Sequence, residues 1–124
     1  MTDHLRILAI EDDPDLGYLY DSFLTEEGHQ VTIARNGREA VKALGTKQDV
    51  VLLDLMLPGT DGYSLLRRIR ADPSMRTLPV VVISAAIPPG RQRILGADAV
   101  VHKPFEFEDL TRVIQGVSHH AHAA

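Results

Sequence analysis

The sequence of 124 residues contains no cysteine and no tryptophan, and aromatic residues make up only 5% of it. The lack of cysteine excludes a disulfide framework, a thiolate metal site and a thiol nucleophile. No apolar run approaches the ~20 residues that a membrane-spanning helix needs, and the first residues do not form a basic and then apolar export signal. These absences favour a cytoplasmic protein with no membrane role.

Positive charge is also scarce. The 13 Lys and Arg residues are outnumbered by 17 Asp and Glu residues, which gives a net charge of −4, and the basic residues form no continuous stripe. Proteins that bind nucleic acid directly usually carry such a stripe. The composition therefore predicts no direct contact with nucleic acid.

The length and the 44% apolar content indicate one compact domain. We expect this domain to cover residues 1–118. Residues 119–124 are too small and polar to pack and are expected to form a disordered tail. Three histidines in that tail could bind a metal, but a frayed chain end is the simpler interpretation.

The most informative stretch is the apolar run that begins at Val50 and leads into Asp54 and a Pro-Gly turn. The run shows no alternation of polar and apolar residues, which is typical of a parallel strand covered on both faces. Asp54 is then the first polar group at the carboxyl end of this strand. Ligands bind at that edge in open α/β sheets.

Strands and helices alternate along the rest of the chain. The sequence predicts further strands at 5–10, 30–34, 79–83 and 99–101. It predicts helices at about 15–27, after Asn36, before Asp72-Pro73, and over the apolar stripe from Phe107 to Val117. Such alternation indicates an α/β fold, with a five-stranded parallel sheet and helices on both faces.

Polar side chains follow four of the five predicted strands: Glu11 and Asp12, Asp54, Ser84, and Lys103. The carboxyl ends of parallel strands share one edge, so these residues should converge there. Carboxylates about 4 Å apart repel by about 4 kcal/mol per pair at an effective dielectric constant of ~20. We therefore expect a cation among them.

A lysine offsets one negative charge, and the remaining acids suit a divalent ion. Carboxylates, a carbonyl and waters are typical ligands of Mg²⁺. The expected ligands are Asp12, Asp54 and a backbone carbonyl just past Asp54, which we assign to Met56. Such a site fits phosphoryl transfer to Asp54, with Lys103 neutralising charge and Ser84 donating a hydrogen bond.

Each of these residues also has a purely structural explanation. The acids at 11–13 can favour a helix start, Ser84 can bond to the backbone, and Lys103 can be a solvated loop residue. It is their combination that favours a functional site.

The motifs Ile-Glu11-Asp12-Asp-Pro, Leu-Leu-Asp54-Leu-Met-Leu-Pro-Gly, Ile-Ser84-Ala and His-Lys103-Pro-Phe resemble those of the receiver domain of two-component response regulators. The resemblance covers Leu5 to about Val117. It implies a flavodoxin-like doubly wound sheet of order 2-1-3-4-5, and it implies that Asp54 accepts a phosphoryl group. It further implies that Glu11 and Asp12 hold Mg²⁺, that Lys103 bonds to the phosphate and that Ser84 is the switch hydroxyl.

The same resemblance implies a place in a two-component phosphorelay. The partners would be a sensor histidine kinase or phosphotransfer protein, and a downstream protein target. The domain would be a phosphoacceptor rather than an enzyme, although it assists its own phosphotransfer and dephosphorylation. The chain would be either a stand-alone receiver or a domain of a longer protein.

Two features depart from the family pattern. The segment between Ser84 and Lys103 is short and contains Pro88-Pro89-Gly90, so the fourth helix of the family should be short or displaced. Val100 stands where the family usually has an aromatic switch residue. We therefore expect phosphorylation mainly to reorder residues 85–95 and to leave the fifth strand nearly unchanged.

Two other functions remain open from sequence. One is an unphosphorylated interaction module with a receiver-like fold. The other is an aspartyl-phosphate hydrolase of the haloacid-dehalogenase type, which would want a second Asp two positions after Asp54, where this chain has Met56. A flavin-binding role is weaker, because no phosphate-binding loop follows the first strand.

Overall fold

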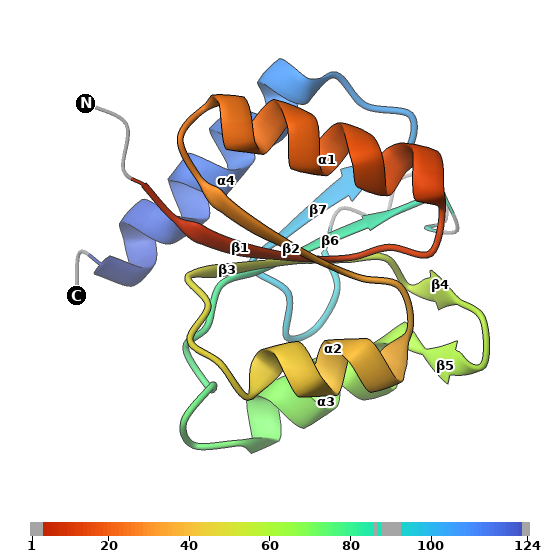
Figure 1. Ribbon diagram of the computed structural model, residues 1–124. Coiled ribbons are helices and arrows are strands. Elements are labelled where there is room, and N and C mark those ends of the chain that lie inside the picture. Colours follow the sequence, from red (N-terminus) through yellow and green to blue (C-terminus); the bar gives the residue numbers. More distant parts are fainter. Residues whose placement is uncertain (1–3, 86, 88–92, 123–124) are drawn as a thin grey trace.

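A five-stranded parallel sheet forms the centre of the protein (Figure 1). The computed structural model describes residues 4–85, 87 and 93–122, with the backbone alone over 119–122. The strand order is β2-β1-β3-β6-β7, as the family resemblance implies. The strands are β1 (Arg6–Ile10), β2 (Gln30–Ala34), β3 (Val50–Leu53), β6 (Val80–Ser84) and β7 (Ala99–His102).

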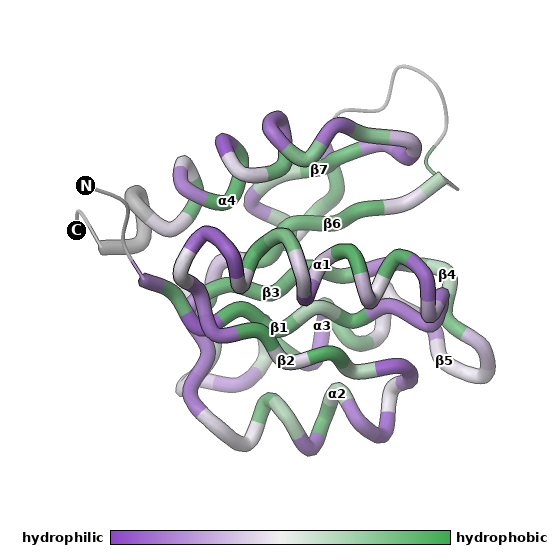
Figure 2. The backbone as a smooth tube through the Cα atoms, turned by 45° about the horizontal axis from the view of Figure 1, so that its top comes forward, coloured by the Kyte–Doolittle hydropathy of each residue, from purple (hydrophilic) through white to green (hydrophobic). Residues whose placement is uncertain are grey.

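Helices cover both faces of this sheet. Helices α1 (Pro14–Glu26) and α4 (Phe107–His122) lie on one face, and α2 (Gly37–Leu44) and α3 (Gly62–Ala71) lie on the other (Figure 1). The strands are mostly hydrophobic, whereas the helices alternate between hydrophobic and hydrophilic residues (Figure 2). The buried side chains accordingly form two hydrophobic clusters, one on each face. No helix within the described residues is long and apolar enough to cross a membrane.

Short polar side chains begin three of the helices. The carboxylate of Asp13 accepts a hydrogen bond from the Asp15 amide, and Asn36 accepts one from the Glu39 amide. Asp61 begins α3 in the same way. These residues satisfy amides that have no partner within the helix. The N-cap at Asn36 is confirmed as the sequence predicts it.

A small antiparallel hairpin, β4 (Met56–Leu57) and β5 (Thr60–Asp61), was not predicted from sequence, where this stretch is simply a turn. Gly59 makes the turn with a φ of +67°, a conformation that glycine adopts without strain. The hairpin continues the chain directly after Asp54. It therefore forms part of the surroundings of that carboxylate.

The last helix is longer than the sequence predicts. Among its described side chains, the last buried one is that of Ser118, and the helical backbone continues to His122, whereas the sequence predicts a disordered tail from residue 119. Helical hydrogen bonds do not require an apolar face, and polar residues readily prolong a helix that is already packed. Residues 123 and 124 lie outside the described part of the chain.

The segment between β6 and β7 is described only in part. Residues 86 and 88–92 lie outside the described residues, and so do most of the segment expected to reorder and much of the expected short or displaced helix. The described residues 85, 87 and 93–98 contain no helix. Ile87 and Ile94, which flank the gap, are buried in the cluster on the α2 and α3 face. Val100 is partly buried against the same cluster.

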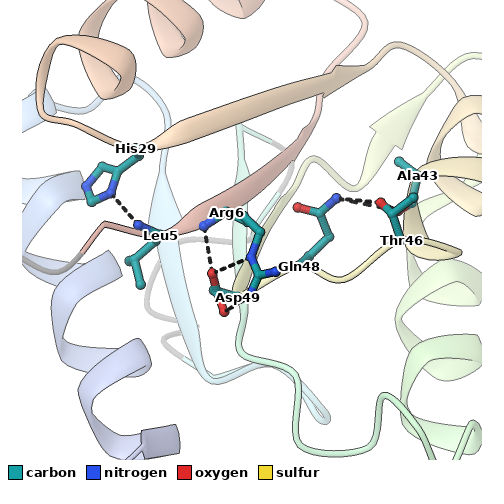
Figure 3. Close-up of polar contacts among 7 residues, drawn as sticks. All are labelled: Leu5, Arg6, His29, Ala43, Thr46, Gln48 and Asp49. Carbon is teal, nitrogen blue, oxygen red and sulfur yellow. Dashed lines mark hydrogen bonds and ion pairs between the residues drawn. The ribbon is translucent and has the colours of Figure 1, made fainter.

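Side chains join the strands at the edge where they begin (Figure 3). Asp49, just before β3, accepts hydrogen bonds from both the backbone amide and the guanidinium of Arg6 at 2.7 and 3.1 Å. The buried ring of His29 accepts a hydrogen bond at Nδ1 from the Leu5 amide at 3.0 Å. These contacts fix the start of β1 against its neighbours.

Arg70, near the end of α3, fixes the starts of β6 and β7 at the same edge. Its guanidinium donates to the backbone oxygens of Leu78 and Gly96, both at 2.7 Å. It also forms an ion pair of 2.8 Å with Asp98, whose Oδ2 accepts the Val80 amide. One side chain thus ties together α3 and the segments that lead into both strands.

Candidate functional site

The opposite edge of the sheet, where the strands end, gathers the acidic residues. Glu11 and Asp12 follow β1, and Asp54 follows the neighbouring strand β3. One carboxylate oxygen from each of the three lies within 4.8 Å of those of the other two. Glu11 and Asp54 are both buried, with only 2% and 6% of their surface exposed. The convergence predicted from parallel strands is therefore present.

Lys103 lies directly among these acids. Its Nζ is 2.7 Å from Oδ2 of Asp54 and 2.8 Å from Oε1 of Glu11. Burial lowers the pKa of Lys103, but its hydrogen bonds to the two carboxylates outweigh burial and raise the pKa overall. The ammonium therefore stays charged, and one cation offsets part of the repulsion between two buried acids.

Backbone contacts hold Asp54 in place. Its own amide donates to the carbonyl of Ile10, and its Oδ1 accepts a hydrogen bond of 2.9 Å from the amide of Met56. Gly62 packs so closely behind this segment that a Cβ there would lie 2.5 Å from Cα of Leu55. A larger residue at 62 would displace the chain beside Asp54, so glycine is required there.

Glu11 is held by the start of α1. The amide of Asp13 donates to Oε2 of Glu11 at 3.1 Å, while Oε1 faces Lys103. Burial raises the pKa of Glu11, and the bonds from Lys103 and Asp13 only partly counter this. The protein thus keeps a carboxylate in a buried position that would favour an added positive ion.

Ser84 is the last residue of β6 and is fully buried. It pairs in register with His102, and its carbonyl accepts the amide of Lys103 at 3.3 Å. The backbone therefore brings Ser84, at the end of β6, and Lys103, just after β7, together at this edge of the sheet. All the side chains expected at the site from sequence come to this edge of the sheet.

The donor set fits a magnesium ion. Oxygen ligands on opposite sides of an octahedral Mg²⁺ lie about 4.2 Å apart. The three carboxylate oxygens, which lie within 4.8 Å of one another, need only small side-chain adjustments to reach that spacing. Glu11, Asp12 and Asp54 have the oxygen chemistry that Mg²⁺ prefers, and the backbone position of Met56 adjoins them. Within the described residues, no other group of three His, Asp or Glu side chains offers ligand atoms so close together.

Sequence reasoning missed one residue beside this site. The spacing of apolar residues in the predicted helix at 15–27 places Tyr20 on its inward face, and Tyr20 is indeed buried. Burial raises its pKa, and the charges of Glu11 and Asp54 raise it further. Its spacing along the helix showed only that it faces inward. Nothing in the sequence showed that it lies within the electric field of the acidic cluster.

These features define a flavodoxin-like α/β protein with an acidic, lysine-containing site at the carboxyl edge of its sheet. The family model of the response regulator receiver domain matches residues 7–115 of the chain. The chain therefore belongs to the response regulator receiver family. Receiver domains are signalling domains that pair with histidine kinases, and they are not classical enzymes.

Relatives and solved structures agree with this assignment. The transcriptional regulatory protein TcrA of Mycobacterium tuberculosis is 38% identical over 119 residues, which are 92% of this chain and 46% of TcrA. The receiver domain of the Pseudomonas aeruginosa sensor histidine kinase PA1611, solved with a magnesium ion coordinated in its active site cleft, is 31% identical. It has a TM-score of 0.84, and the match covers 94% of this chain and 99% of that domain.

A third similar structure is the response regulator TrrA of Thermotoga maritima in complex with Mg²⁺ and BeF. It is 29% identical with a TM-score of 0.79, and the match covers 91% of this chain and 98% of TrrA.

The chain spans about half the length of the curated relatives it matches. Several of these relatives are named transcriptional regulatory proteins. Their names do not support the sequence-based expectation that the protein makes no contact with nucleic acid. That expectation rested on the charge of this chain alone.

Proposed function

We propose that this domain accepts a phosphoryl group on Asp54 from a histidine kinase or phosphotransfer protein and passes the signal on through protein contacts. The observation that carries the proposal is the position of the Lys103 ammonium, 2.7 Å from Oδ2 of Asp54 and 2.8 Å from Glu11. A cation placed against a buried carboxylate suits a reaction that adds negative charge at that carboxylate.

Each residue of the site has a separate role in the proposed phosphoryl transfer. Asp54 supplies the nucleophilic oxygen, and the amide of Met56 holds Oδ1 so that the carboxylate keeps one orientation. Lys103 neutralises the charge on the phosphoryl oxygens. The hydroxyl of Ser84, which lies on the strand next to Lys103, bonds to the bound phosphoryl group.

Glu11, Asp12, Asp54 and the carbonyl of Met56 would hold Mg²⁺. The ion would supply further neutralisation of the phosphoryl oxygens and lower the repulsion between Asp54 and an incoming phosphate donor. Two observations support this assignment: the spacing of the three carboxylates and the magnesium ion in the similar PA1611 receiver domain.

We place the receiver domain at 1–118 and its activity in the cytoplasm, where a phosphorelay to a soluble target takes place. Exposed Tyr18 and Leu19 on α1 lie one to two turns from the acids that precede this helix. Such apolar side chains beside the site offer a surface for the phosphate donor.

Intact-mass measurement after incubation with acetyl phosphate and Mg²⁺ tests the proposal. The wild-type protein should gain one phosphoryl group, and Asp54→Asn should gain none, because an amide is a poor nucleophile. Asp61→Asn is the matched control: Asp61 is an exposed acid outside the site, and Asn preserves its role at the start of α3. No labelling of the wild type would favour the unphosphorylated interaction module instead, and labelling of Asp54→Asn would place the phosphoryl group on another residue.

A further inference from the structure

Four aromatic rings pack together beside the site. The cluster contains Tyr20, Phe23, Phe105 and Phe107, which include all three phenylalanines of the chain. Two rings come from α1, and two come from the segment that leads from Lys103 into α4. In a protein with only 5% aromatic residues, this concentration links α1 to the segment that carries the lysine.

Phe107 contacts the other three rings of this cluster, and Tyr20 contacts both rings that follow Lys103. Tyr20 stacks on Phe105 with the ring centres 6.2 Å apart and the planes 8° from parallel, and it meets Phe107 edge to face at 6.0 Å. Phe105 and Phe107 also contact each other at 5.4 Å. Only 2% of Tyr20 is exposed, whereas Phe105 is partly exposed. Tyr20 therefore forms a fixed surface against which Phe105 rests.

Phe105 is two residues after Lys103, so its position sets that of the lysine backbone. At Lys103 itself, the backbone is held by the hydrogen bond that its amide donates to the carbonyl of Ser84. Two residues later, the chain is held by the contacts of the Phe105 ring with Tyr20 and Phe107. A lysine side chain has many rotamers, and a fixed backbone limits where its ammonium can go.

We propose that Tyr20 is a positioning residue, whose ring holds the segment from Lys103 to Phe105 and thereby keeps the Lys103 ammonium where a phosphoryl group on Asp54 requires it. The proposal rests on the function proposed above and adds a residue of α1 to the site. Electrostatics agree with it, because Glu11 and Asp54 both act on the pKa of Tyr20, which places this side chain close to the acids that Lys103 bridges.

The proposal separates two kinds of binding. Lys103 is not a magnesium ligand, so a change at Tyr20 that moves its ammonium should not weaken the binding of Mg²⁺ alone. Beryllofluoride, a phosphoryl mimic, would contact the Lys103 ammonium, so a change at Tyr20 should lower the affinity of the protein for beryllofluoride. A mutation that merely loosens the fold would not produce this split.

The experiment measures the affinities for Mg²⁺ and, at saturating Mg²⁺, for beryllofluoride in four proteins. Tyr20→Leu should weaken beryllofluoride binding about three- to tenfold, the range expected for an aromatic pair. Its Mg²⁺ affinity should stay within about twofold of the wild type. Tyr20→Phe keeps the ring and should bind both like the wild type.

Leu24→Ala is the matched control. Leu24 lies one turn further along α1 and is fully buried in the same hydrophobic cluster, but it has no aromatic ring. This change should lower the stability of the fold without shifting either affinity. Should Tyr20→Leu fail to fold, Phe105→Leu removes the other half of the stack and should give the same split.

A double-mutant cycle with Lys103→Met completes the test. If Tyr20 acts through Lys103, then Tyr20→Leu should cause no further loss of beryllofluoride affinity once the lysine is absent. A further loss in that background, or wild-type affinity in Tyr20→Leu, overturns the proposal. A wild-type protein that binds no beryllofluoride would instead refute the proposed phosphoacceptor function.

Discussion

Lys103 Nζ lies 2.7 Å from Oδ2 of Asp54, and no other described cation lies within 4.0 Å of that carboxylate. Because Asp54 is buried and its neighbour Glu11 is also an acid, this contact both stabilises the resting site and prepares it for added charge. Under the proposed function, the same lysine would serve the fold before phosphorylation and the chemistry during it.

Removal of this cation should be costly to the fold. In buffer without Mg²⁺, Lys103→Met should lower the free energy of unfolding by about 3 kcal/mol, because it leaves two buried carboxylates without their partner. Urea unfolding measures this loss. Arg112→Met, which breaks an exposed pair with Asp109, should change stability by less than about 0.5 kcal/mol. Equal effects of the two substitutions would contradict the role given to Lys103.

Magnesium should stabilise the folded protein. An ion that binds only the native state adds about 2.7 kcal/mol at a hundred times its dissociation constant. Asp12→Ala should abolish the rise in melting temperature that Mg²⁺ produces, and a chelator should reverse it in the wild type. Asp13→Asn removes an adjacent charge but keeps the helix cap, so it should retain the rise. If Asp12→Ala retains it too, the ion binds elsewhere.

Much of this site was predictable because parallel topology brings strand ends together. The apolar run before Asp54 identified the central strand, and the polar residues after each strand identified the edge. The contact between Lys103 and Glu11 was less accessible, because they are 92 positions apart and only the sheet brings them together. The role of Tyr20 was not visible, since an inward-facing helical position looks the same whatever it packs against.

In the fold, too, features set by local sequence were predictable, and features set by contacts between distant elements were not. N-caps and strands depend on local sequence, so Asn36 and the strand at 30–34 were predicted correctly. In the predicted helix at 15–27, Leu19 and Phe23 have the spacing of an apolar stripe, yet 47% and 40% of their surface is exposed. The spacing of apolar residues shows which side of a helix faces the core. How wide a part of that side is buried depends on the elements that pack against it, which the sequence alone does not place.

Stability should fall in mild acid because of His29. Burial lowers the pKa of this histidine below its ordinary value of 6.5, and its Nδ1 must stay unprotonated to accept the Leu5 amide. Below pH 6.5 the unfolded chain therefore binds a proton that the folded chain does not, and stability decreases as the pH falls.

His29→Asn tests this directly. The amide oxygen of Asn can accept the same hydrogen bond without titrating, so chemical unfolding at pH 7.5 and pH 5.5 should show a smaller difference than in the wild type. His102→Asn, at an exposed position at the end of β7, serves as the control and should leave the difference intact. If His29→Asn loses as much stability between pH 7.5 and pH 5.5 as the wild type, titratable groups other than His29 cause the loss.

Arg70 should be among the least replaceable side chains outside the site. Arg70→Met removes the ion pair with Asp98 and the bonds to the carbonyls of Leu78 and Gly96, and it should lower the free energy of unfolding by about 3 kcal/mol or more. Arg68, two residues earlier on the same helix, is exposed, so Arg68→Met should cost less than about 0.5 kcal/mol. Thermal unfolding of the two variants distinguishes them.

The clamp made by Arg70 also constrains how a signal can leave the site. It anchors the entry points of β6 and β7, while Ser84 and Lys103 stand at the far ends of these strands. With these entry points held, a displacement that begins at Ser84 or Lys103 should stay at the carboxyl edge, where the Lys103 amide donates to the Ser84 carbonyl, rather than reach the base of the sheet.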